Sequence, residues 1–128
     1  MNIGLLEDNP AILDYMTTAL QLAGHSVEKH IESSTLLETL FPRESAAYSL
    51  PYDLVIVDIL LPGDVSGVTT IQHIHQAIPP ETLPIIVVSA CSRDELEQVK
   101  LKLPHVPVLR KPFKMHVLLQ LIQEMKGF

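Results

Sequence analysis

The sequence is poor in cysteine, has no tryptophan and lacks long runs of apolar residues. Its one cysteine, Cys91, cannot form a disulfide within the chain, which favours a reducing compartment, and we expect the cytoplasm. The longest apolar runs, at 54–57 and 85–88, are far shorter than the roughly 18 residues that a membrane-spanning helix needs. Because no basic segment precedes the first expected strand, we expect neither a membrane span nor a signal peptide.

Basic residues are also scarce. Nine lysines and arginines stand against fifteen aspartates and glutamates, which gives a formal net charge of -6. The basic residues are scattered, and only Arg110, Lys111 and Lys114 lie near one another. A nucleic-acid-binding surface normally needs a basic stripe to offset phosphate charge. We therefore expect no direct contact with DNA or RNA.

Length and composition indicate one ordinary globular domain over residues 1–128. Apolar stretches without alternation predict strands at 2–6, 54–57, 85–88 and 106–109, and a more polar strand is expected at 26–30. Helical spacing predicts helices at 10–23, 68–78, 93–103 and 114–126, with a short helix near 35. This alternation predicts a doubly wound α/β domain, in which helices cover both faces of a five-stranded parallel sheet.

Turn residues mark the expected helix ends. Asn9 followed by Pro10 is a typical helix start, and Gly24 suits the left-handed residue that ends the same helix. Two later stretches, 35–38 and 92–95, each have the spacing of a capping box, and each predicts a helix start.

Polar residues gather at the expected carboxyl ends of four strands: Glu7, Asp8, Asp58, Ser89 and Lys111. In an open parallel sheet, ligands bind beyond the carboxyl ends, where the strand order reverses. Carboxylates this close repel one another by about 4 kcal/mol per pair at about 4 Å, so a cation must compensate for them. An oxygen-only cluster suits Mg²⁺ better than zinc, which prefers histidine and cysteine.

Four short motifs, taken in this order, resemble the receiver domains of bacterial two-component systems: Glu7-Asp8, DILLPG at 58–63, Ser89-Ala90 and Lys111-Pro112-Phe113. The resemblance covers essentially the whole chain. It implies a flavodoxin-like fold with the strand order 2-1-3-4-5. It also implies a phosphoacceptor domain that a histidine kinase or a histidine phosphotransfer protein phosphorylates, and that changes conformation to control an output.

The resemblance also implies a role for each residue of the site. Asp58 is the phosphoacceptor, whose carboxylate forms an acyl phosphate. Asp8 and Asp58 hold Mg²⁺ directly, Glu7 holds it largely through a water molecule, and the backbone carbonyl of Leu60 completes the protein ligands. Lys111 pairs with Asp58 before transfer and with a phosphoryl oxygen after it.

Further implied roles concern the phosphoryl group and the conformational switch. Ser89 hydrogen-bonds a phosphoryl oxygen and so biases the domain between two conformations, and the backbone of Leu60 and Ala90 contacts the same group. The Lys-Pro bond of the family is typically cis, which we expect at Lys111-Pro112. Many receivers carry an aromatic switch residue at the position of Val108, so this chain must signal through backbone and loop shifts instead.

Two further expectations come from the resemblance. Leu60 and Cys91 stand where residues of the family flank the path of an attacking water, and because neither is acidic we expect slow loss of the phosphoryl group. Receivers often dimerise through the face formed by the fourth helix, fifth strand and fifth helix, and a homodimer through that face is expected here.

Three other functions fit parts of the pattern. A degenerate receiver would bind a partner without ever accepting phosphate, but the complete set of acids, hydroxyl and lysine argues against it. A flavodoxin-like electron carrier needs a phosphate loop after the first strand, where Glu7-Asp8 would repel a flavin phosphate. A haloacid-dehalogenase-type phosphatase needs a second acid at position 60, which is a leucine. The cognate kinase and the output stay open.

The histidines do not form a metal site in this interpretation. His73 and His75 are two residues apart on one expected helix and point in different directions. The others, expected singly at the surface, are His25, His30, His105 and His116.

Overall fold

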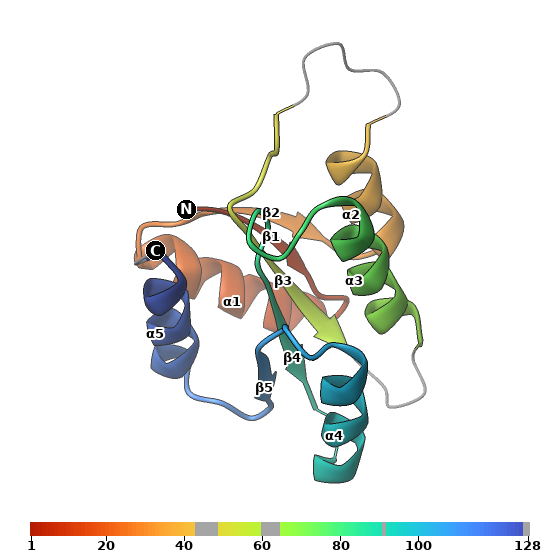
Figure 1. The fold of residues 1–128 in the computed structure, drawn as a ribbon. Helices are drawn as coiled ribbons and strands as arrows, with labels where there is room; N and C mark the ends of the chain where they lie inside the picture. The colour runs from red at the N-terminus through yellow and green to blue at the C-terminus, as the bar shows by residue number, and fades with distance from the viewer. Residues whose placement is uncertain (43–48, 60–64, 91, 127–128) are drawn as a thin grey trace.

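The computed structural model describes residues 1–42, 49–59, 65–90 and 92–126, and in these ranges five strands form one parallel sheet (Figure 1). In chain order the strands are β1 (Asn2–Leu6), β2 (Ser26–His30), β3 (Leu54–Ile59), β4 (Ile85–Ser89) and β5 (Val108–Arg110). Their order in the sheet is β2-β1-β3-β4-β5, and every neighbouring pair is parallel. The expected fold class and strand order are confirmed.

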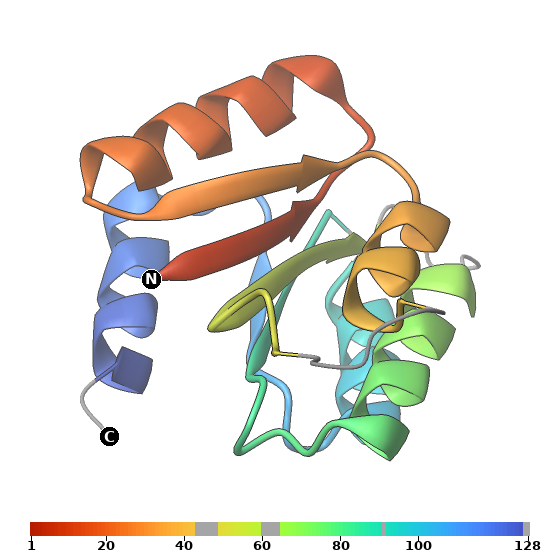
Figure 2. The same ribbon diagram turned by 90° about the horizontal axis from the view of Figure 1, so that it is seen from above.

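Helices cover both faces of the sheet. One face carries α1 (Pro10–Leu22) and α5 (Met115–Lys126), and the other carries α2 (Ser33–Leu40), α3 (Val65–Ala77) and α4 (Arg93–Lys102), as the view from above shows (Figure 2). Side chains of β1 alternate between the two cores, because Leu5 packs on the α1 side and Leu6 on the α2 side. Among the described helices, none has the length and apolar character to cross a membrane.

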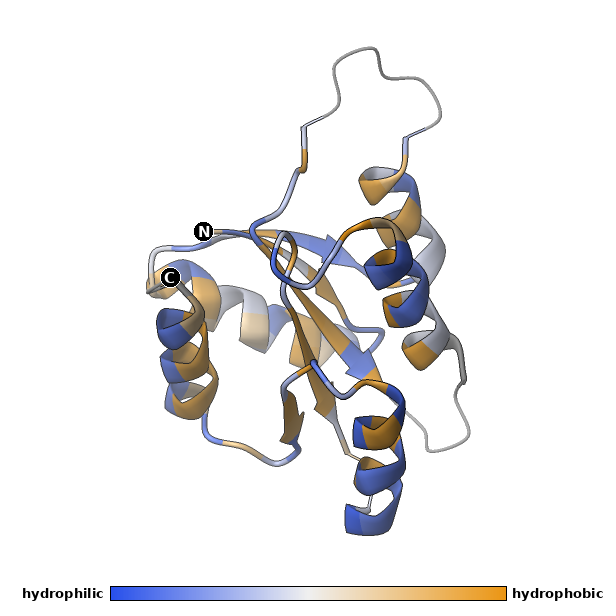
Figure 3. Cartoon of the chain, viewed as in Figure 1, coloured by the Kyte–Doolittle hydropathy of each residue, from blue (hydrophilic) through white to orange (hydrophobic). Residues whose placement is uncertain are grey.

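The central strands are buried and the edge strand β2 is not. Every residue of β3 and β4 is buried, whereas four of the five residues of β2 are at least partly exposed. Figure 3 shows apolar residues along most of the central strands and a mixture of apolar and polar residues along the helices. Asp58 and Ser89 lie at the carboxyl ends of the two buried strands, so the packing of the sheet holds both polar residues in the interior.

Three of the predicted helix boundaries are confirmed. The Asn9 side chain accepts hydrogen bonds from Ala11 N–H and Ile12 N–H and caps α1. Gly24 follows that helix with a φ of 96°, which only glycine adopts readily. At the start of α4, Ser92 Oγ accepts a hydrogen bond from the N–H of Glu95.

Other boundaries differ from the predictions. The capping box at 35–38 is wrong, because α2 begins at Ser33 and the Thr35 hydroxyl instead donates to the carbonyl oxygen of Glu32 at 2.9 Å. Strand β3 continues through Asp58 to Ile59, since both residues pair with β4. Helix α3 begins at Val65, earlier than predicted, and β5 begins later, at Val108.

Candidate functional site

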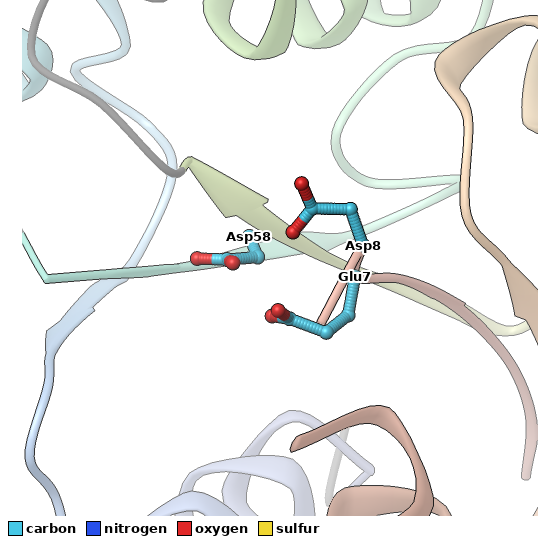
Figure 4. A group of neighbouring side chains, drawn as sticks. All are labelled: Glu7, Asp8 and Asp58. Carbon is cyan, nitrogen blue, oxygen red and sulfur yellow. The ribbon is translucent and has the colours of Figure 1, made fainter. Parts of the chain in front are cut away.

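Three carboxylates meet at the carboxyl edge of the sheet. Glu7 and Asp8 follow β1 directly, and Asp58 lies in β3. Because Leu6 of β1 pairs with Val57 of β3, the residues that come next on the two strands lie side by side. One carboxylate oxygen of each acid lies within 4.8 Å of the others (Figure 4). The predicted convergence of these residues is confirmed.

The three acids differ in burial. Glu7 is 1% exposed and Asp58 is 7% exposed, whereas Asp8 is open to solvent. Two of the negative charges therefore lie in surroundings that solvate them poorly.

Lys111 is the cation that faces this cluster. Its Nζ lies 3.2 Å from Glu7 Oε2 and 3.2 Å from Asp58 Oδ2, so two buried carboxylates share one ammonium group. When both acids are ionised and Asp8 is counted, three negative charges face one positive charge. The cluster is thus short of positive charge.

Glu7 and Asp58 differ in how their oxygens are held. Glu7 Oε1 accepts a hydrogen bond from Asn9 N–H at 3.1 Å, and Oε2 accepts one from Lys111. Among the residues that the structure describes, neither Asp58 oxygen accepts a hydrogen bond, although Lys111 Nζ stands at ion-pair distance. Burial and the neighbouring Glu7 raise the pKa of Asp58, Lys111 opposes the shift, and together they bring this pKa to about 7.

The residues present fit a magnesium ion. Among the described residues, the donors that converge here are all carboxylate oxygens, and the two buried oxygens of Asp58 lack hydrogen-bond donors. Hard cations such as Mg²⁺ take oxygen ligands and keep several waters, which the exposed side of Asp8 allows. A divalent cation would also correct the shortage of positive charge.

Ser89 and Lys111 come from the neighbouring strand ends. Ser89 is fully buried, and its hydroxyl donates to the carbonyl oxygen of Ile59 at 2.9 Å. The N–H of Lys111 donates to the carbonyl oxygen of Ser89 at 2.6 Å, which ties the β5 end to β4. The Lys111-Pro112 bond is cis, as expected. Ala90, next to Ser89, is exposed.

The remaining predicted positions are less informative. Leu60, expected to contribute its backbone, and Cys91 both lie outside the described residues. Val108 is half-buried at the start of β5, where it pairs with Val87 and packs against the core on the α2 side.

One histidine prediction is wrong. His30 is 6% exposed, not a surface residue, and its ring nitrogens bond to Thr35 and Tyr52. The polar sequence of β2 does not indicate that His30 is buried. The available signal was Tyr52, which stands just before a buried strand, but it lies 22 residues from His30 in the sequence.

The model of the family described as response regulator receiver domain matches residues 3–123 of this chain. The chain is 31% identical over 114 residues to a probable transcriptional regulatory protein of Picosynechococcus sp., which covers 89% of this chain and 44% of that protein. It is 29% identical over 90 residues to the signal transduction histidine-protein kinase BarA of Escherichia coli, covering 70% of this chain and 9% of that protein. The chain thus spans less than half the length of these curated relatives.

Solved structures share the fold. The BeF3-activated N-terminal receiver domain of Klebsiella pneumoniae RstA superposes with a TM-score of 0.78 at 20% identity, covering 98% of this chain and 97% of that one. A CheY-like response regulator receiver domain protein of Methanospirillum hungatei gives a TM-score of 0.75 at 24% identity, with coverage of 98% and 94%.

Proposed function

Because this chain belongs to the response regulator receiver domain family, we propose that residues 1–128 form one phosphoacceptor domain, in which Asp58 accepts a phosphoryl group from a phosphorylated histidine. The donor is a histidine kinase or a histidine phosphotransfer protein. The observation that carries the proposal is the state of Asp58, a buried carboxylate whose oxygens lack hydrogen bonds among the described residues and which lies 3.2 Å from Lys111.

The transfer is a displacement at phosphorus. A carboxylate oxygen of Asp58 attacks, the bond from phosphorus to the donor imidazole breaks, and the leaving imidazole takes up a proton from solvent. The Asp8 and Asp58 carboxylates and the Leu60 carbonyl would hold Mg²⁺ directly, with Glu7 acting through water. The ion supplies positive charge to the phosphoryl oxygens.

Lys111 and Ser89 bind the transferred group. The Lys111 ammonium, now shared by Glu7 and Asp58, pairs with a phosphoryl oxygen after transfer. The Ser89 hydroxyl exchanges its bond to the Ile59 carbonyl for one to another phosphoryl oxygen, and the backbone of Leu60 and Ala90 completes the contacts. This exchange couples phosphorylation to the loop after β4.

The output step differs from the commonest receiver pattern. Val108 has no aromatic ring to rotate between the core and the surface, and it is already half-buried. We propose that the switch instead moves the backbone of α4, β5 and α5. Exposed apolar residues of two of these elements, Leu101 of α4 at 74% and Val117 of α5 at 40%, would support a homodimer. Size-exclusion chromatography with and without beryllofluoride tests this, and an unchanged monomer counts against it.

An apolar cleft beside the site would receive the donor protein. It has a volume of about 460 Å³, and Lys111 lines both this cleft and the carboxylate cluster. Tyr15 of α1, which is 62% exposed, and Phe113 are the two aromatic residues that line it. Phe113→Ala should therefore slow transfer from a phosphohistidine-bearing protein and leave transfer from acetyl phosphate unchanged.

We place the domain in the cytoplasm, where ATP supplies the phosphoryl group of histidine kinases. The one cysteine of the chain is compatible with this reducing compartment. The acidic net charge of -6 supports a protein partner and gives no support to direct nucleic-acid binding.

Acetyl phosphate with Mg²⁺ provides the test. Mass spectrometry should detect one added phosphoryl group on the wild-type chain and none on Asp58→Asn. The control is Asp53→Asn, which changes an exposed aspartate just before β3 and should still be phosphorylated. An adduct that persists in Asp58→Asn, or none in the wild type, would favour a receiver that binds its partner without phosphorylation. Because neither Leu60 nor Cys91 is acidic, the adduct should decay slowly, and a lifetime of seconds would contradict this expectation.

A further inference from the structure

A second polar cluster, the His30 network, lies at the end of β2. It consists of the buried side chains of His30 and Tyr52 and the exposed residues Glu28 and Thr35. His30 Nδ1 is hydrogen-bonded to Thr35 Oγ1 at 2.9 Å, and Nε2 is hydrogen-bonded to the Tyr52 hydroxyl at 2.6 Å. The Tyr52 hydroxyl donates to Glu28 Oε1 at 2.5 Å. Each imidazole nitrogen therefore faces a hydroxyl oxygen, and the bond to Tyr52 is buried whereas the bond to Thr35 is partly open to solvent.

Tyr52 connects three strands through this network. It precedes β3, its ring lies over Gly4 of β1, and its hydroxyl reaches β2. A Cβ on Gly4 would stand 2.7 Å from Tyr52 Cε2, so a glycine is needed for the ring to cross. Because β2 is an edge strand with a neighbour on one side only, its end frays more easily than a central strand. The network ties that end to β3 and, through Thr35, to α2.

The backbone of His30 touches the carboxylate cluster. Its carbonyl oxygen accepts a hydrogen bond from the N–H of Glu7 at 3.0 Å. The Glu7 carboxylate is held in turn by Asn9 N–H and by Lys111. A displacement of the His30 carbonyl would thus reach Glu7 and its neighbour Asp8, two of the three acids that converge on one point.

We propose that His30 and Tyr52 are positioning residues for the metal-binding carboxylates, acting through the hydrogen bond from Glu7 N–H to the His30 carbonyl. The inference deepens the proposed function, on which its metal readout rests. Neither residue touches the metal or the phosphoryl group. The network holds the end of β2 so that the carbonyl of His30 faces Glu7 and fixes the path of the chain as it leaves β1.

A purely structural network would lower stability and leave the metal site unchanged, so the test must separate the two effects. Tyr52→Phe removes one bond to His30, and Thr35→Val removes the other with little change of shape. The matched control is Ile74→Val, which trims a fully buried side chain in α3 outside both polar clusters and also lowers stability.

Two measurements on the full chain decide the proposal. Outer-shell partners of metal ligands typically change metal affinity by roughly 10- to 100-fold, and because His30 acts through one further bond we expect the Mg²⁺ dissociation constant of Tyr52→Phe to rise about three- to tenfold. In Tyr52→Phe, hydrogen exchange of the Glu7 amide should also become faster by more than the loss of global stability accounts for. Ile74→Val should show neither effect. A dissociation constant within about twofold of wild type in both network variants, with Glu7 exchange that follows global unfolding, overturns the proposal.

The double variant Tyr52→Phe/Thr35→Val tests whether both residues act on the carboxylates through His30. Since both changes act through His30, the double variant should weaken Mg²⁺ binding by less than the product of the two single effects. Effects that simply multiply would mean that the two residues act independently, and would contradict a route through His30.

Failure of the proposed function is distinguishable from failure of this inference. If the wild-type chain binds Mg²⁺ but gains no phosphoryl group, the proposed function fails while the Mg²⁺ constants still decide the role of the network. If the wild type binds no Mg²⁺, the exchange rate of the Glu7 amide decides alone, and an unchanged rate overturns the inference.

Discussion

Two polar clusters, each built around buried side chains, lie side by side at the carboxyl ends of β1 and β2, and they are built in opposite ways. In the His30 network both imidazole nitrogens have hydrogen-bond partners, and the tyrosine hydroxyl has a carboxylate acceptor. In the carboxylate cluster the two oxygens of Asp58 have no hydrogen-bond donor among the described residues. A satisfied buried group stabilises one conformation, whereas a buried group left without partners costs stability and is retained where a ligand completes it.

The difference also appears in the charges. Glu28, the carboxylate of the His30 network, is 57% exposed at its side chain, so water solvates its charge. Asp58 has no such access and depends on Lys111, which it shares with Glu7. The comparison predicts opposite effects of substitutions on the stability of the metal-free protein. Removing a charge from the carboxylate cluster should raise the free energy of unfolding, and disturbing the His30 network should lower it.

Replacing Asp58 by asparagine should have the largest effect on stability. In the metal-free protein Asp58→Asn should stabilise the fold by up to about 3 kcal/mol at pH 8. The pKa rises from 3.8 to about 7, each pKa unit is worth about 1.4 kcal/mol, and solvent at the edge of the sheet screens part of the charge. The folded-state pKa lies above the unfolded one, so ionisation disfavours folding. The penalty begins above pH 3.8 and is complete above about pH 7.

Urea unfolding in chelator at pH 8 and near pH 4 measures this gain. The advantage of Asp58→Asn should nearly disappear at the acidic pH, because Asp58 is then protonated in the folded state. The control Asp14→Asn, which removes an exposed acid that forms a surface ion pair with Lys29, should give a small change at both pH values. An equal advantage at both pH values would show that burial of the charge is not its cause.

Mg²⁺ should supply positive charge to the carboxylate cluster and so stabilise the folded protein. At a concentration of about 100 times its dissociation constant, Mg²⁺ should stabilise the wild-type fold by about 2.7 kcal/mol, by mass action alone. Thermal unfolding with and without Mg²⁺ measures this. Asp58→Asn and Asp8→Asn should lose most of the effect, whereas Asp14→Asn should keep it. Equal stabilisation of all four proteins would mean that the ion binds elsewhere.

Crowding the His30 network should cost somewhat less. Gly4→Ala places a Cβ 2.7 Å from Tyr52 Cε2 and 2.8 Å from Cδ2, so the ring must move away from β1. We expect a loss of about 1–3 kcal/mol, the usual cost of inserting an atom into a packed core. Urea unfolding of Gly4→Ala, Tyr52→Leu and the double variant tests the cause. The double variant should cost less than the sum of the two, and additive costs would exclude the contact with Tyr52 as the reason.

The sequence predicts these two clusters very unequally. Glu7, Asp58, Ser89 and Lys111 could be placed together because the carboxyl ends of parallel strands share one edge, and strand ends follow from apolar runs. His30 could not be placed, because β2 is otherwise partly or fully exposed and the burial of its last residue depends on Tyr52, which precedes a different strand. The bonds of the Glu7 carboxylate to Asn9 N–H and to Lys111 likewise need coordinates.

The starts of α2 and β5 were predicted wrongly because of local hydrogen bonds. Thr35 matches the first residue of a capping box by spacing, but its hydroxyl bonds the carbonyl of Glu32 and the imidazole of His30. Helix α2 therefore begins earlier than predicted, at Ser33. Strand β5 begins at Val108 and not at 106, because the N–H of Val106 turns back to the carbonyl of Leu103 and Pro107 has no N–H to donate. The spacing of apolar residues does not predict such local hydrogen bonds, which compete with regular helix or strand bonding.

Thr17 offers the smallest and most direct comparison with Asp58. Its hydroxyl oxygen in α1 is buried and, within the described part of the chain, has no hydrogen-bond partner, yet α1 contributes none of the residues proposed to bind Mg²⁺ or the phosphoryl group. Without a ligand to complete it, this group should only cost stability, so Thr17→Val should be neutral or stabilise the fold by up to about 1 kcal/mol. Urea unfolding measures the gain, and Mg²⁺ affinity and phosphorylation by acetyl phosphate should not change. If Thr17→Val weakened Mg²⁺ binding or phosphorylation, the Thr17 hydroxyl would contribute to the site. Thr17 could then no longer serve as an example of a buried oxygen that lacks both a partner and a ligand.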